Sequence, residues 1–127
     1  MKKVLVTRKL IKENSERISK IFDVKLNNDD TIFSSDELLK YSKDCDGILT
    51  FPTSSLNKDL IMALSDSVKI ISNYAVGFGN IDIEAAKNNG IIVTNTPDVL
   101  TDATADISIL LLLGASRRAY EGRKAAE

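Results

Sequence analysis

The pattern of apolar and polar positions along residues 1–100 predicts a succession of strands and helices. Five short runs are rich in β-branched and other apolar residues: 3–7, 22–26, 47–51, 68–73 and 91–95. The segments between them place apolar residues at helical spacing, as Leu56, Leu60 and Leu64 do. The last three runs are almost continuously apolar, which is typical of parallel strands with helices on both faces. The pattern predicts a flavodoxin-like, doubly wound α/β fold around a parallel five-stranded sheet.

Two short motifs mark helix ends. Ser34 and Glu37 have the spacing of a capping box, in which each side chain bonds to the backbone N–H of the other residue, directly before Leu38. Asn89-Gly90 is typical of a helix C-terminus, because glycine readily adopts the left-handed conformation found there. We therefore expect one helix to begin after Ser34 and another to end at Asn89.

The chain changes character after the fifth apolar run. Thr96-Pro-Asp predicts a turn, and Thr101 or Asp102 is placed to cap a final long helix. That helix carries the run 107–115 and is apolar on nearly all sides, so a small domain alone cannot cover it. We expect the helix to bind a second surface and the polar tail 119–127 to add no further strand.

Composition and charge exclude several kinds of partner. The net charge is −1 and the Lys and Arg residues are spread along the chain, so neither nucleic acid nor an anionic membrane surface is expected to bind. The longest apolar run falls well short of the roughly 20 residues that cross a bilayer. The first residues turn polar at Thr7 before a signal-peptide core develops, which predicts a cytoplasmic protein. With 127 residues, the chain has room for one core.

The chain contains no histidine and a single cysteine, Cys45, which restricts its chemistry. Without an imidazole, a hydrolytic, zinc or hydride-transfer site lacks its usual ligand or proton donor near pH 7. Cys45 cannot form an internal disulfide and is expected to be a small buried apolar residue. The acidic pairs Asp29-Asp30 and Asp44/Asp46 are expected to serve turns and caps, so no metal site is predicted.

The stretch Asn73-Tyr-Ala-Val-Gly-Phe-Gly-Asn-Ile-Asp82 contains a Gly-x-Gly loop between a strand and a helix. A dinucleotide-binding loop needs Gly or Ala three residues after the second glycine, where this chain has Asp82, whose carboxylate would repel a pyrophosphate. Gly77 and Gly79 allow positive φ, so the N–H groups near Val76 and Gly77 are expected to point outward and bind a small carboxylate. The alternative is a tight turn in which Asp82 caps the next helix.

Residues 73–118 resemble the D-isomer-specific 2-hydroxyacid dehydrogenases, particularly the glyoxylate and hydroxypyruvate reductases. Three motifs carry the resemblance in fixed order: Ala-Val-Gly-x-x-Asn-Ile-Asp, Asn95-Thr-Pro-Asp, and Thr101-Asp-Ala-Thr-Ala-Asp at the start of the apolar helix. The family commonly has Asp where Gly79 stands, and often Glu where Asp106 stands. The resemblance implies a substrate-binding α/β domain over residues 1–100, an interdomain hinge helix and tail over 101–127, and an NAD(P)-binding domain that these residues do not include.

The resemblance also implies roles for individual residues. The backbone N–H groups of Val76 and Gly77 would hold the carboxylate of a 2-oxo or 2-hydroxy acid, and Thr50 and Phe51 would line the substrate pocket. Thr104 would lie beside the nicotinamide of NAD or NADP. The hinge helix would pack against the missing cofactor domain and form the interface of a homodimer.

The chain has no Gly-x-Gly-x-x-Gly motif and no imidazole to protonate a carbonyl oxygen. We therefore expect that it has no catalytic residue of its own, binds no NAD or NADP tightly, and does not reduce glyoxylate or hydroxypyruvate by itself. Two alternatives stay open: a stand-alone flavodoxin-like binding module, and a truncated partner that oligomerises through the apolar helix. Thr7-Arg8 and Thr50-Phe51 disfavour a phosphoacceptor receiver or a flavin site, because they lack the acidic or Ser/Thr-rich residues that these sites need.

Overall fold

The computed structural model describes residues 1–127 and separates them into two compact units, Met1–Pro97 and Asp98–Glu127. The first unit alternates strands and helices, as the hydrophobic pattern predicts. Its elements are β1 (Lys3–Val6), α1 (Lys12–Ser19), β2 (Asp23–Leu26), α2 (Ser35–Ser42), β3 (Gly47–Thr50), α3 (Lys58–Ala63), β4 (Ile70–Asn73), α4 (Ile83–Asn88) and β5 (Ile92–Thr94). The second unit consists of α5 (Thr101–Ser116) and α6 (Ala119–Ala126).

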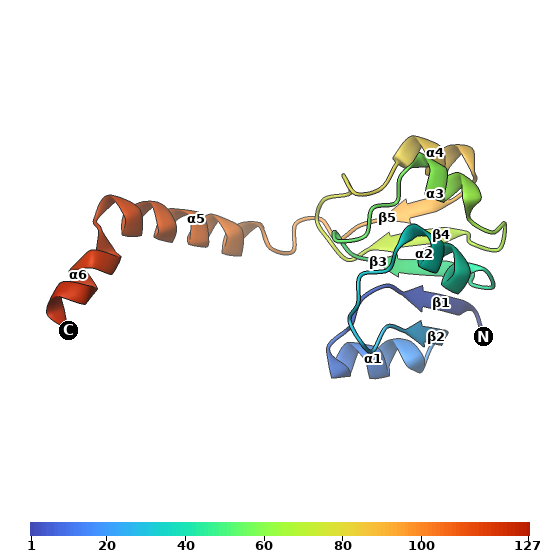
Figure 1. Ribbon diagram of the computed structural model, residues 1–127, viewed down its shortest axis with the longest axis horizontal. Helices are drawn as coiled ribbons and strands as arrows, with labels where there is room; N and C mark the ends of the chain where they lie inside the picture. The colour runs from blue at the N-terminus through green and yellow to red at the C-terminus, as the bar shows by residue number, and fades with distance from the viewer. The chain divides into compact units, whose positions relative to one another are not determined.

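The five strands form one parallel sheet in the order β2-β1-β3-β4-β5 (Figure 1). Leu5, Ile48 and Ile71 lie side by side on the three central strands, and Val93 extends this row onto β5. This is the strand order of flavodoxin-like folds, so the predicted fold is confirmed.

The core lies on the face of the sheet that α2, α3 and α4 cover. Successive residues of a strand point to opposite faces, so Leu5, Ile48 and Ile71 share this face, and each is at most 2% exposed. Cys45 is also fully buried in the core, as predicted, and burial raises the pKa of its thiol. The helices contribute further buried side chains: Leu38, Leu60, Ile61, Ala85 and Ala86.

The opposite face of the sheet is less covered than the continuous apolar strands predict. Within the first unit α1 alone lies against it, and α1 has no buried residue. Ile18 of α1, with Leu49 and Ile70 of the sheet, lines an open hollow of about 380 Å³. Ile70 is 38% exposed, and Ile92 on the edge strand is 63% exposed. The expectation of helices over both faces therefore holds fully for one face and in part for the other.

Local sequence signals set most helix ends. The Ser34 hydroxyl accepts from the Glu37 N–H, and the Glu37 carboxylate accepts from the Ser34 N–H at 2.8 Å, which confirms the capping box. Gly90, with a φ of 68°, follows α4 as predicted. The predicted side-chain cap of α5 is wrong, because the apolar residue Leu100 occupies the cap position.

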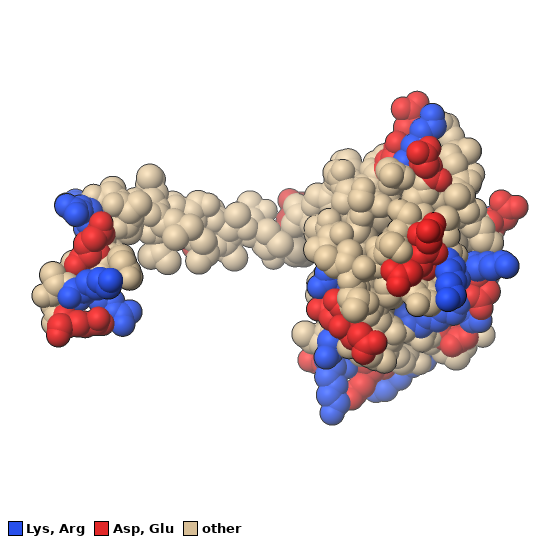
Figure 2. All heavy atoms as spheres, in the orientation of Figure 1, with Lys and Arg blue, Asp and Glu red and all other residues tan.

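The two helices of the second unit expose different side chains. Figure 2 shows α5 nearly free of charged atoms over most of its length, whereas charged side chains gather on α6. Arg118 has a left-handed conformation, with a φ of 49°, so the chain turns there instead of continuing one helix. None of the helices combines the length and hydrophobicity of a membrane span. The large apolar side chains of α5 are each between 54% and 69% exposed: Ile107, Ile109, Leu110, Leu111, Leu112 and Leu113.

Candidate functional site

The loops that follow β3 and β4 meet at the carboxyl edge of the sheet, the edge at which open α/β sheets bind ligands. The N–H of Leu56, in the first loop, donates to the Asn80 carbonyl of the second loop at 2.8 Å. The Leu56 carbonyl accepts from the Asp82 N–H at 2.9 Å. The Phe51 and Tyr74 rings pack against each other with their centroids 5.1 Å apart. The two loops therefore form one connected surface.

Two successive carbonyl groups of the β4 loop bond to the residues that follow β5. The Ala75 carbonyl accepts from the Thr96 N–H at 2.9 Å. The Val76 carbonyl accepts from the Asn95 side-chain amide at 2.7 Å. All peptide bonds are trans, and in a planar trans peptide the N–H points opposite to the carbonyl. The N–H groups of Val76 and Gly77, which belong to these two peptides, therefore point away from the end of β5.

Neither of these two N–H groups has an acceptor within the chain. The next N–H, that of Phe78, is also free, and the Gly77 carbonyl of the same peptide accepts from the Asn73 side-chain amide at 2.8 Å. Successive unpaired N–H groups on a loop provide the positive partial charge that binds a small anion. The arrangement at Val76 and Gly77 can therefore accept a carboxylate, and the identity of the anion stays a prediction.

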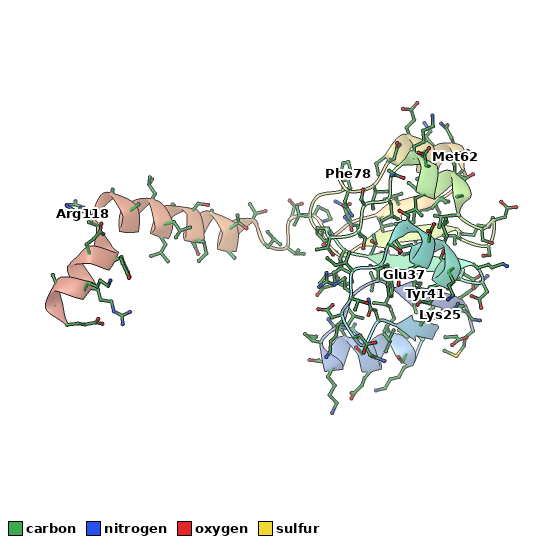
Figure 3. All side chains as sticks on the ribbon, viewed as in Figure 1. Lys25, Glu37, Tyr41, Met62, Phe78 and Arg118 are labelled. Carbon is green, nitrogen blue, oxygen red and sulfur yellow. The ribbon has the colours of Figure 1, made fainter.

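The two glycines of this loop do not adopt the positive φ that the sequence predicts. The glycine with a positive φ is Gly90, which follows α4. A Cβ placed on Gly77 or Gly79 would meet no other atom within 4 Å. No neighbour in the chain requires glycine at these positions, so the missing side chains leave open space beside the free N–H groups. Phe78, between the two glycines, is half exposed to solvent (Figure 3).

Asp82 caps α4, as the alternative account of the loop predicts. Its carboxylate accepts from the Ala85 N–H at 2.9 Å. The cap and an anion site at Gly77 are compatible, because they use different N–H groups. A pyrophosphate does not fit here, because α4 has only six residues and carries this carboxylate at its N-terminus. No three His, Cys, Asp or Glu side chains gather to hold a metal ion.

Thr50 and Phe51 lie at the carboxyl end of β3, next to the β4 loop. Thr50 is fully buried, so its side chain lies beneath the loop and not in an open pocket. Its carbonyl accepts from the Tyr74 N–H at 2.8 Å, and its hydroxyl has no hydrogen-bond partner. Phe51 is partly buried against Tyr74. The Phe51 ring is thus placed to line one side of a site at the β4 loop, whereas Thr50 supports this loop through its backbone carbonyl.

Four polar residues at this edge are absent from the predicted site. Three of them are asparagines that surround the β4 loop: Asn73, Asn80 and Asn95. The sequence indicates two of these positions, because the fourth and fifth apolar runs both end in asparagine.

The fourth polar residue, Arg8, is a cation at the same edge. Its guanidinium donates to Asp30 at 2.8 Å, which lowers the pKa of Asp30 to about 2. The charge of Arg8 is therefore already partnered.

Thr104, the residue predicted to lie beside the nicotinamide, belongs to α5 in the second unit. Its hydroxyl donates to the Leu100 carbonyl at 2.9 Å, a bond within the first turn of the helix. The role of Thr104 toward a cofactor stays a prediction.

Comparison with known proteins gives independent evidence about the chain. Residues 4–124 match the family model described as D-isomer specific 2-hydroxyacid dehydrogenase, catalytic domain. The glyoxylate reductase of Thermococcus onnurineus is 40% identical over 122 residues, which are 96% of this chain and 36% of that protein. The glycerate dehydrogenase of Hyphomicrobium methylovorum is 39% identical over 123 residues, which are 97% of this chain and 38% of that protein.

A solved structure is similar to the chain in both fold and sequence. It is the NADPH-dependent glyoxylate/hydroxypyruvate reductase from Sinorhizobium meliloti in complex with NADP and malonate, which is 32% identical with a TM-score of 0.71. The match covers 89% of this chain and 34% of that one, so the chain spans about a third of the length of these relatives. Because the family model matches nearly all of its residues, the chain belongs to the D-isomer specific 2-hydroxyacid dehydrogenase family.

Proposed function

We propose that Met1–Pro97 is a substrate-binding part of an NAD(P)-dependent oxidoreductase that reduces short 2-oxo acids such as glyoxylate or hydroxypyruvate. The observation that carries the proposal is the pair of unpaired N–H groups at Val76 and Gly77. The carbonyls of the same peptides are held by hydrogen bonds, so these donors are oriented before an acid arrives. The name glyoxylate reductase and the malonate bound by the Sinorhizobium meliloti enzyme support a small acid as ligand.

Each predicted site residue has a distinct role in this proposal. The Val76 and Gly77 N–H groups bind the carboxylate, Phe51 bounds the pocket, and Thr50 supports the loop from below. Two fixed donors orient the acid, which is how a binding site lowers the entropic cost of a later reaction. NAD or NADP bound by a cofactor domain would supply the hydride, and we propose that Thr104 would then lie beside its nicotinamide. None of the 127 residues is assigned a catalytic role.

Titration of the isotopically labelled chain with oxamate, a stable analogue of a 2-oxo acid, tests the proposal by NMR. We expect the N–H resonances of Val76 and Gly77 to shift most, because they form new hydrogen bonds to a charged acceptor. A dissociation constant on the order of 1 mM is expected for so small a ligand. Oxamide, which is neutral, is the control and should leave these resonances in place. Equal shifts with oxamide, or no shifts in this loop, would contradict the proposal.

We also propose that α5 is the surface through which the chain binds a cofactor domain or a second copy of itself. The helix exposes six large apolar side chains and carries no charged residue between Asp106 and Arg117. A contiguous apolar surface of this kind marks an interaction site on a protein. In the isolated chain, the available partner for α5 is a second copy.

Replacing Leu110 and Leu111 by Glu is expected to weaken self-association of the chain at least about tenfold. Burial of each leucine side chain contributes roughly 1.5–3 kcal/mol, and a change of about 1.4 kcal/mol is tenfold in a dissociation constant. Sedimentation equilibrium over a range of concentrations measures the effect. Tyr120→Glu on α6 is the matched control, because Tyr120 is as exposed as these leucines and lies outside α5. A wild-type chain that stays monomeric at high concentration would contradict the proposed surface.

A further inference from the structure

Three asparagine side chains donate hydrogen bonds around the β4 loop, and two of them, Asn73 and Asn80, also bond to each other. We call Asn73, Asn80 and Asn95 the asparagine clamp. Asn80 donates to the carbonyls of Phe51 and Ser54 at 3.1 and 3.0 Å, so it ties the loop after β3 to the loop after β4. Asn73 is 1% exposed and donates to the side-chain oxygen of Asn80 at 2.9 Å. The clamp therefore connects both loops of the proposed site through buried or partly buried amides.

The clamp also ends on carbonyls of the proposed acid site. Asn95 donates to the Val76 carbonyl at 2.7 Å, and Asn73 donates to the Gly77 carbonyl at 2.8 Å. A carbonyl turned toward the ligand would place its negative partial charge against a carboxylate. An asparagine amide prevents this, because its N–H₂ group donates to the carbonyl, whereas an ionised aspartate can only accept. The residue type at these positions therefore matters for the direction of the peptide.

We propose that Asn73 and Asn95 are positioning residues of the acid site, an inference that rests on the proposed function. Asn95 holds the Val76 carbonyl away from the ligand, so the Gly77 N–H of the same peptide is presented to it. Asn73 fixes the next peptide, whose N–H belongs to Phe78, and so holds the loop in place directly after the two proposed donors. The two asparagines touch neither acid nor cofactor and act through the backbone. The bonds end on the peptides whose N–H groups are free, which distinguishes this role from general bracing of the fold.

Asn95→Asp and Asn95→Ala test the role in the 127-residue chain, with oxamate binding followed at the Gly77 N–H. Both variants are expected to bind oxamate about tenfold more weakly, because the site loses the orientation of one charge-assisted hydrogen bond. Asn95→Gln keeps an N–H₂ donor and is expected to recover part of the affinity. The alanine variant separates loss of the donor from the negative charge that aspartate adds.

Asn89→Asp is the matched control. Asn89, at the C-terminal end of α4, donates its side-chain amide to the Ile61 carbonyl at 2.9 Å, so the same kind of bond is lost outside the site. We expect Asn89→Asp to lower the Tm of the chain about as much as Asn95→Asp does, but to leave oxamate binding unchanged. Unchanged binding in both Asn95 variants, or weakening in Asn95→Asp alone, would overturn the positioning role and leave the proposed function intact. A wild-type chain that does not bind oxamate would overturn both.

Discussion

The 127-residue chain alone is expected to leave NADH and NADPH unoxidised when glyoxylate or hydroxypyruvate is supplied. The chain has no histidine, and the carboxylate of Asp82, which follows the same loop, caps α4. General acid–base assistance is typically worth about 10²- to 10⁴-fold in rate, and the chain has no evident group to provide it. Hydride transfer also needs a bound cofactor, and the Gly77-x-Gly79 loop does not fit a pyrophosphate. The rate of NADH or NADPH oxidation should therefore equal the background rate measured in buffer without the chain.

The loss of reduced-nicotinamide absorbance measures this prediction. The complete glyoxylate reductase of Thermococcus onnurineus, assayed under the same conditions, is the positive control. Oxamate binding by the same preparation of the chain shows whether the acid site has formed, so binding without turnover is the expected combination. A rate clearly above that of buffer would mean that these residues contain both a cofactor site and a proton donor, and it would refute the proposal that the chain binds the acid while a separate cofactor domain supplies the hydride.

The order of elements could be predicted from the sequence because most of the signals are local. A capping box spans Ser34 to Glu37, and a left-handed glycine stands at Gly90, so each specifies its helix end without reference to the rest of the chain. Gly47 is different. A Cβ on this residue would lie 2.8 Å from Cγ2 of Ile70, so the need for glycine depends on how β3 and β4 pair. No short stretch of sequence contains that information.

The candidate site was predictable only in part, for the same reason. The motif resemblance indicates the Val76 and Gly77 N–H groups, but it does not indicate what orients them. The bond from Asn95 to the Val76 carbonyl joins residues 19 positions apart and depends on the pairing of β4 with β5. The sequence suggests a positive φ at Gly77 because glycine can adopt it, but Gly77 does not adopt it in the structure. Hydrogen bonds from Asn95 and Thr96, which follow β5, hold the carbonyls of the Val76 and Gly77 peptides, and that contact is not visible in a short stretch of sequence.

Burial along the strands shows the same limit. Ile71 on β4 is fully buried, whereas Ile92 on β5 is 63% exposed, although both are isoleucines in continuous apolar runs. The difference arises because they point to opposite faces of the sheet, and α2, α3 and α4 cover only one of these faces. Local hydrophobicity cannot distinguish the two positions, but their contributions to stability should differ strongly.

Replacing Ile71 by Ala is expected to lower the free energy of unfolding of the first unit by about 2–5 kcal/mol. The substitution removes buried apolar atoms from the central strands and leaves a cavity between residues that cannot fully close it. This is a large fraction of the roughly 5–15 kcal/mol that stabilises a typical domain. Because the chain has no tryptophan, urea unfolding is best followed by far-UV circular dichroism.

Ile92→Ala is the matched control, because it removes the same atoms from a side chain on the open face of the sheet. A change within about 0.5 kcal/mol is expected. Equal losses in the two variants would contradict the exposure of this face and would mean that it is buried in solution. If a second copy of the chain buries it, the loss at Ile92 should shrink on dilution, whereas the loss at Ile71 should not. A large loss at Ile71 alone would assign the stability of the unit to the face under α2, α3 and α4.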